Sequence, residues 1–110
     1  MVTLLSWNVN GARAMHSGGF LPWLAATAPD IVCLQETRAD ADQLPPEMRQ
    51  PEGYHAYWHG SARKKGYSGT ALLSRRPPDA VQFGLGVPEF DDEGRTIIAR
   101  IRLPSTLAAA

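Results

Sequence analysis

The chain has 110 residues, 44% of them hydrophobic and 20% charged, which is the composition of a single globular domain with a modest core. Eleven basic and eleven acidic residues give a formal net charge of zero, so overall charge provides no argument for a nucleic-acid partner. The single cysteine, Cys33, excludes an internal disulfide, and no apolar run approaches the roughly 20 residues that cross a membrane, so the sequence predicts a soluble cytoplasmic protein.

The first 35 residues alternate strand and helix patterns. Short apolar runs at Val2–Trp7 and Ile31–Leu34 predict two buried strands. Between them we expect a polar, glycine-bearing loop at Asn8–Ser17 and then a helix over residues 19–28, where apolar side chains recur at helical spacing. Because a strand, a helix and a second strand form a right-handed parallel unit, both strands should end at the same edge of one sheet.

The middle of the chain predicts a weak helix followed by a hairpin. Asp40–Gln50 has helical character, but Pro45 and Pro46 interrupt it. Residues 54–58 form an alternating aromatic strand pattern, and residues 70–73 an apolar one. The basic, glycine-punctuated segment between these two runs predicts a charged hairpin loop.

Two further strands are expected toward the C-terminus, at Ala80–Phe83 and Thr96–Leu103, with a loop at Gly84–Gly94 between them. In the second of these strands apolar residues occupy one face, while Arg100 and Arg102 occupy the other. The order of elements predicts an α/β fold with one sheet and its flanking helices.

Asn8 and Glu36 are the first candidates for chemistry, because each directly follows a predicted strand. Oxygen ligands held on rigid strand ends are what a hard cation such as Mg²⁺ needs to meet a phosphate. Each residue also has an ordinary explanation, since Asn8 could cap a turn and Glu36 could form a surface ion pair with Arg38. The two residues alone leave these interpretations open.

The basic loop carries a second candidate site. Arg63, Lys64 and Lys65 lie close to Tyr67, so three cations and an aromatic ring share one loop. This combination suits phosphates together with a sugar or base edge. A solvated hairpin tip would have the same composition. Acidic residues gather separately, at residues 89–93.

The histidines and tryptophans receive structural interpretations. His55 and His59 are four residues apart, but in a strand such side chains stand about 13 Å apart, which argues against a shared zinc ion. His16 falls in the predicted loop before the first helix. The three tryptophans are interpreted as core residues: Trp7, Trp23 and Trp58.

Four segments occur in a recognisable order: Leu5–Ala14 (LSWNVNGARA), Pro29–Arg38 (PDIVCLQETR), Gly66–Arg75 (GYSGTALLSR) and Glu93–Ile98 (EGRTII). Together they resemble the exonuclease III-type apurinic/apyrimidinic endonucleases of the endonuclease/exonuclease/phosphatase superfamily. The resemblance implies the N-terminal half of a four-layered, DNase I-like α/β sandwich. It also implies a DNA repair nuclease that hydrolyses phosphodiester bonds at abasic sites and 3′ ends with Mg²⁺, or with Mn²⁺ in its place.

The resemblance assigns metal-site roles to three residues. Glu36 resembles the family's metal-binding glutamate. Asn8 resembles the active-site asparagine that contacts the metal network and the scissile phosphate, so both residues are implied to be catalytic. Asn10 stands where relatives have an aspartate or an asparagine, and it is implied to be a further neighbour of the metal.

The resemblance also indicates a DNA-binding surface. Arg13, and Ala14 through its main chain, resemble positions that meet the DNA backbone. Tyr67 resembles a tyrosine that lies against the minor groove, with Lys64 and Lys65 beside it. The implied partner is double-stranded DNA with abasic sites or 3′ ends and not a membrane, with an association with the nucleoid if the source is bacterial.

The second half of the family's pattern is missing. The sequence has no Asp-x-Asn pair and no Ser-Asp-His ending, which in relatives complete the catalytic set. We therefore expect residues 1–103 to form an incomplete N-terminal lobe and residues 104–110 an unstructured or truncated tail. We also expect little or no nuclease activity from the chain alone, and the C-terminal half of the domain as its partner.

Two alternatives stay open. A truncated pseudo-enzyme would bind DNA without cutting it. A phosphatase of the same superfamily would share Asn8 and Glu36, but not the Gly66–Leu73 hairpin with its Tyr67.

Overall fold

The computed structural model describes residues 1–102, and Leu103 and the predicted tail at 104–110 lie outside the described residues. Its elements in chain order are β1 (Leu4–Asn8), α1 (Ala12–Ser17), α2 (Phe20–Thr27), β2 (Ile31–Gln35), a 3₁₀ turn η1 (Ala41–Gln43), α3 (Pro46–Arg49), β3 (His55–His59), β4 (Thr70–Ser74), β5 (Ala80–Phe83), α4 (Pro88–Asp91) and β6 (Ile97–Arg100).

Four of the strands form one sheet in the order β1-β2-β4-β3, and β5 and β6 form a separate hairpin. β1 and β2 run parallel, in register from Leu4 opposite Ile31 to Asn8 opposite Gln35. β4 pairs antiparallel with both β2 and β3. The predicted α/β class, the parallel unit and the β3–β4 hairpin are therefore confirmed. The expectation of one sheet is wrong, because β5 and β6 pair with each other and not with the four-stranded sheet.

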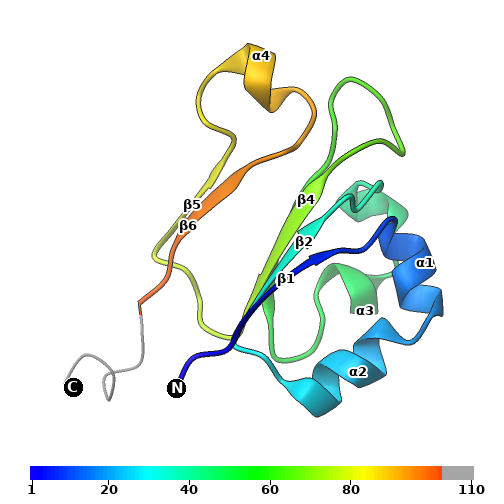
Figure 1. The fold of residues 1–110 in the computed structure, drawn as a ribbon, viewed down its shortest axis with the longest axis vertical. Helices are drawn as coiled ribbons and strands as arrows, with labels where there is room; N and C mark the ends of the chain where they lie inside the picture. Colours follow the sequence, from blue (N-terminus) through cyan, green and yellow to red (C-terminus); the bar gives the residue numbers. More distant parts are fainter. Residues whose placement is uncertain (103–110) are drawn as a thin grey trace.

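The core lies between this sheet and the helices α1, α2 and α3, which gather on one side of it (Figure 1). Alternate residues of β2 and β4 point into this layer, because successive side chains of a strand face opposite ways. The buried hydrophobic residues of this layer are Ala12, Met15, Phe20, Leu24, Val32, Leu34, Ala39, Leu44, Met48, Ala56, Ala71 and Leu73.

The expectation of a continuous loop at Asn8–Ser17 is wrong, because residues 12–17 form α1, which carries His16. Ala12 and Met15, one helical turn apart, are both buried against the sheet. Because most of the surrounding residues are polar, the sequence pattern does not reveal this short apolar stripe. α2 agrees with the predicted helix, with Phe20 and Leu24 buried four residues apart.

The segment Asp40–Gln50 is divided as its prolines predict, with η1 before Pro45 and α3 after it. Arg49 closes the segment, since its guanidinium donates to the carbonyls of Ala41 at 2.8 Å and Leu44 at 2.9 Å. These bonds replace the continuous helical ladder that the prolines prevent.

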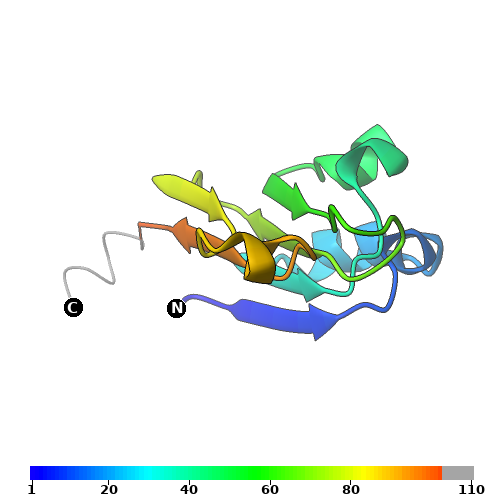
Figure 2. The same ribbon diagram turned by 90° about the horizontal axis from the view of Figure 1, so that it is seen from above.

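The β5–β6 hairpin lies on the side of the sheet away from α1, α2 and α3, and a view from above shows the same separation (Figure 2). The predicted loop at Gly84–Gly94 contains the helix α4, which is a correction. Asp91 at its end accepts the backbone N–H groups of Leu85 (2.8 Å), Gly86 (2.8 Å) and Val87 (2.9 Å). These bonds, that of Leu85 first, lower the pKa of the Asp91 carboxyl.

None of the helices within residues 1–102 is long and apolar enough to cross a bilayer.

A matched pair of leucine substitutions tests the assigned core. Leu73 is fully buried and Leu85 is 51% exposed. Leu73→Ala should lower the free energy of unfolding by about 2–5 kcal/mol, because it leaves a cavity between the sheet and the helices. Leu85→Ala should change it by about 0.5 kcal/mol or less. Urea unfolding followed by circular dichroism measures both, and equal losses would contradict this core.

Candidate active site and nucleic-acid interface

The ends of β1 and β2 are joined beyond the last strand residues. Asn8, the last residue of β1, lies opposite Gln35, and Glu36 follows directly. Backbone bonds continue the pairing: Gly11 N donates to the Glu36 carbonyl at 2.8 Å, and Ala12 N donates to the next carbonyl at 2.7 Å. The structure therefore brings Asn8 and Glu36 to the same edge of the sheet.

Three residues at this edge have left-handed backbones. The φ angles are 49° at Asn10, 55° at Glu36 and 54° at Arg38. Such a conformation costs a residue other than glycine roughly 1–2 kcal/mol. Flanking bonds hold it in place, because Thr37 N donates to Gly69 O at 3.2 Å and Arg38 N donates to the Ser68 carbonyl at 2.8 Å. The direction of the Glu36 side chain is thus set by strands on both sides.

The side chains of Asn8 and Glu36 differ in the contacts that they make within the protein. The Oδ1 atom of Asn8 accepts the backbone N–H of Asn10 at 3.1 Å, so Asn8 does cap a turn, as one interpretation expected. Its Nδ2 group makes no hydrogen bond within residues 1–102. The ion pair of Glu36 with Arg38 is not formed, since no cation within the described residues lies within 4.0 Å of the Glu36 carboxylate.

These residues can supply part of a magnesium site. Within residues 1–102 no three His, Cys, Asp or Glu side chains come together as a metal-binding group. Glu36, Asn8 and Asn10 provide one carboxylate and two amide oxygens at one edge. Mg²⁺ usually takes only one or two carboxylates and completes its shell with waters and substrate phosphates. The donor set therefore fits one side of such a site.

Arg13 and Ala14 lie on α1, beside the same edge. They line an open hollow of about 370 Å³ together with Arg38 and Gly66. Arg38 is the residue that sequence reasoning missed, because it was considered only as a partner for Glu36. Its position two residues beyond the strand-end glutamate is the signal that could have identified it. Two guanidinium groups thus border one open hollow next to the basic loop.

Lys64, Lys65 and Tyr67 lie in the loop of residues 60–69, which joins β3 to β4. Arg63 of this loop is paired, since its guanidinium lies 3.7 Å from the Asp92 carboxylate and 3.9 Å from that of Glu93. Neither lysine forms an ion pair with any residue that the structure describes. Tyr67 is 40% exposed. The loop therefore offers two unpaired ammonium groups and one aromatic ring.

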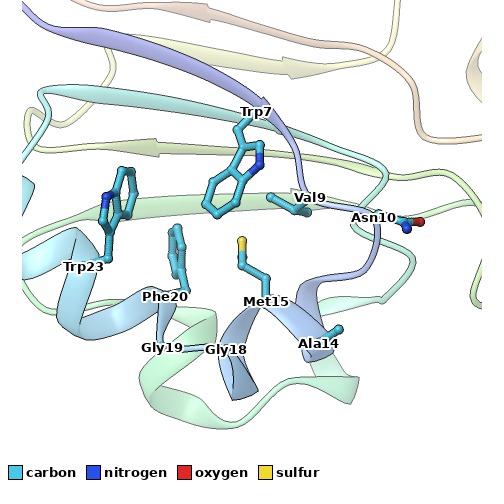
Figure 3. Close-up of a pocket in the computed structure, with 9 residues that line it drawn as sticks. All are labelled: Trp7, Val9, Asn10, Ala14, Met15, Gly18, Gly19, Phe20 and Trp23. Carbon is cyan, nitrogen blue, oxygen red and sulfur yellow. The ribbon is translucent and has the colours of Figure 1, made fainter.

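A second, apolar hollow of about 550 Å³ opens beside β1, α1 and α2 (Figure 3). Trp7 and Trp23 line it and meet edge to face, with ring centroids 5.7 Å apart. They are 43% and 38% exposed, so their interpretation as core residues is wrong. For Trp7 the reason is that β1 is an outer strand of the four-stranded sheet. Asn10 also lines this hollow, with its side chain directed away from the two tryptophans (Figure 3).

Comparison with known proteins gives consistent matches. Residues 5–109 match the profile of the endonuclease/exonuclease/phosphatase family. The chain is 52% identical over 95 residues to the exodeoxyribonuclease of Bacillus subtilis, covering 86% of this chain and 36% of that protein. It is 45% identical over 97 residues to the DNA repair nuclease APEX1 of Danio rerio, covering 87% of this chain and 31% of that protein.

Solved structures agree in fold. An AP endonuclease from Archaeoglobus fulgidus superposes with a TM-score of 0.76 at 35% identity, covering 92% of this chain and 37% of that one. The 3′ phosphatase NExo from Neisseria, bound to a product DNA hairpin, has the same TM-score and identity and is covered over 38% of its length. The fold is therefore of the DNase I-like kind, and the chain spans about a third of the length of these relatives.

Two glycines of one loop test how tightly the strand ends are tied. A methyl group on Gly69 would lie 2.4 Å from Thr37 Oγ1, whereas one on Gly66 would meet nothing within 4 Å. Both residues have positive φ, so backbone strain in each alanine variant should lower the free energy of unfolding by roughly 1–2 kcal/mol. Gly69→Ala should lose more stability than Gly66→Ala, because it also separates β4 from the segment after Glu36. Thermal unfolding of both variants measures this, and equal losses would argue against a tight junction.

Proposed function

Because the chain belongs to the endonuclease/exonuclease/phosphatase family, we propose that it provides the metal-binding side of a DNA repair nuclease of the exonuclease III type. The reaction is hydrolysis of DNA phosphodiester bonds at abasic sites and 3′ ends, and the substrate is double-stranded DNA. One observation carries the proposal: two parallel strands end together at a hydrogen-bond donor, Asn8, and a carboxylate, Glu36, which has no ion-pair partner among residues 1–102. The names of the relatives support the substrate class.

Glu36 would hold the cation from the end of β2, with the amide oxygens of Asn8 and Asn10 as neighbours. Bound there, Mg²⁺ supplies Lewis-acid polarisation of a phosphoryl oxygen and neutralises charge on the leaving 3′ oxygen. The Nδ2 group of Asn8 donates to a phosphate oxygen on which negative charge develops. Neither amide can take the proton of the attacking water, so the general base comes from outside this set of three residues.

The surrounding cations position the duplex. Arg13 and Arg38 border an open hollow beside the strand ends, where a backbone phosphate can accept hydrogen bonds from two guanidinium groups. Lys64 and Lys65 meet phosphates further along, and the ring of Tyr67 lies against the sugars or base edges of the minor groove. These contacts carry little sequence information, which suits an enzyme directed to a lesion or an end.

Metal binding by Glu36 can be measured without catalysis. Glu36→Gln should weaken Mn²⁺ binding at least about tenfold, because even a residue that only supports a metal ligand usually contributes that much. The matched control is Glu52→Gln, the same change at an exposed site between α3 and β3. Water-proton relaxation by Mn²⁺ or calorimetry gives both affinities.

If the two glutamine variants bind Mn²⁺ as well as the parent chain, Glu36 is not a metal ligand. Incision of a labelled abasic duplex in Mg²⁺ is then measured with the chain alone. Because the general base comes from outside these three residues, we expect duplex binding with little or no cleavage, and metal-dependent cleavage that Glu36→Gln abolishes would contradict that expectation.

The salt dependence of duplex binding tests the basic loop. If Lys64 and Lys65 each neutralise one phosphate, replacing both with alanine should reduce the slope of log K against log salt by about 1.8, or about 0.9 per lysine. Fluorescence anisotropy with a labelled abasic duplex at several salt concentrations provides the slopes. Arg100→Ala on β6 is the control. If it reduces the slope as much per removed charge as the lysine substitutions do, the effect comes from net charge and not from contacts of the basic loop.

A further inference from the structure

The segment Asp92–Arg95, just before β6, runs across the basic loop of residues 60–69. The carbonyl of Asp92 accepts the backbone N–H groups of Ala62 at 2.8 Å and Arg63 at 3.2 Å, at the start of the loop. At the end of the loop, Thr70 Oγ1 donates to the carbonyl of Gly94 at 3.0 Å. One segment therefore ties both ends of the loop, and the loop and the connection from α4 to β6 lie at the same end of the molecule (Figure 1).

Gly94 makes this close approach possible. Its φ is 64°, and a methyl group there would lie 2.5 Å from the carbonyl oxygen of His59. Only glycine combines this backbone conformation with so near a neighbour. The two flanking residues, Glu93 and Arg95, are thereby directed toward the tip of the loop.

Arg95 connects Glu93 to Tyr67. Its Nε donates to Glu93 Oε1 at 3.0 Å, and its Nη2 donates to the Tyr67 hydroxyl at 3.1 Å. The guanidinium carbon lies 5.8 Å from the centre of the tyrosine ring. The hydrogen bond from Arg95 lowers the pKa of the Glu93 carboxyl, and the same bond raises the pKa of Arg95. Glu93 also faces Arg63 at 3.9 Å.

We propose that Arg95 is a positioning residue that, anchored on Glu93, holds Tyr67 and the tip of the basic loop in the conformation that meets DNA. The inference rests on the proposed DNA-binding function, since it assigns how one binding residue is held. The proposal also implies that the Tyr67 hydroxyl is bonded to Arg95 and not to the DNA. The ring meets the duplex with its open face, and Arg95 acts through Tyr67 rather than on a phosphate.

Electrostatics and positioning predict opposite signs for one substitution. Glu93→Gln removes a negative charge beside Lys64 and Lys65, so attraction to phosphates alone would tighten duplex binding. Under the proposal the same change weakens binding about fivefold, the size of an exposed ion pair, because Arg95 loses its anchor. Tighter binding by Glu93→Gln would overturn the proposal.

A double-mutant cycle tests whether Arg95 acts through the tyrosine hydroxyl. Arg95→Lys keeps the charge but loses the planar fork that reaches two partners, and Tyr67→Phe keeps the ring but loses the hydroxyl. Each should weaken binding of an abasic duplex about fivefold. Combined, they should again cost about fivefold, whereas independent contacts would multiply to about 25-fold. Arg100→Lys, the same change on the exposed side of β6, should leave affinity unchanged.

The free chain provides a readout that does not require DNA. The ring-proton NMR shifts of Tyr67 should change in Arg95→Lys and Glu93→Gln, but not in Arg100→Lys. In the parent chain they should stay constant as pH falls through the ordinary carboxyl range and change only below it, because the pKa of Glu93 is lowered and its anchor is lost only on protonation. Unchanged shifts in both variants would overturn the proposal. A duplex that fails to bind while the shifts respond as expected would instead contradict the proposed function.

Discussion

The short parallel pairing of β1 with β2, extended past the strand ends by backbone bonds, is the constraint on which the rest of the site depends. Gly11 and Ala12 donate to the carbonyls of Glu36 and Thr37, and Thr37 in turn donates to Gly69 at the start of β4. Three chain segments are thus joined at one edge. Helix α1 begins there, and the basic loop ends there, so the residues proposed to bind metal and those proposed to bind DNA share one rigid frame.

The sequence was sufficient to place the regular elements of this frame. Apolar runs identified β1 and β2, and helical spacing of Phe20 and Leu24 identified α2. β2 and α2 each bury one face, whereas β1, which was predicted as a buried strand, is largely exposed. The site edge followed from the rule that parallel strands end together. The sequence did not predict α1 or α4, since a short helix with two buried residues, as in α1, or with none, as in α4, produces no detectable period. Nor did it predict that β2 pairs with β4, which depends on long-range packing.

The detailed site was less predictable, for physical reasons that concern individual residues. Nothing local indicates that Glu36 and Arg38 have left-handed backbones, because such conformations are imposed by bonds from neighbouring strands. The ion pair that was one open interpretation of these two residues is not formed within residues 1–102. Arg63 and Glu93 are 30 positions apart, so their pairing could not be read from the two separate charge clusters. Trp7 gave a core signal, but it lies on an outer strand and is partly exposed.

The zero net charge of the chain is compatible with a DNA partner because only some of the basic residues around the loop form ion pairs with acidic ones. Arg63 and Arg95 are engaged by Asp92 and Glu93, and these acidic residues act on the loop that they hold. Lys64 and Lys65, adjacent in sequence to Arg63, are left unpaired among the described residues and face solvent. An ammonium group without a protein partner keeps its full attraction for a phosphate, whereas a paired guanidinium has lost most of it. The acidic segment therefore does not oppose binding. It fixes the loop with two cations and leaves the other two for the duplex.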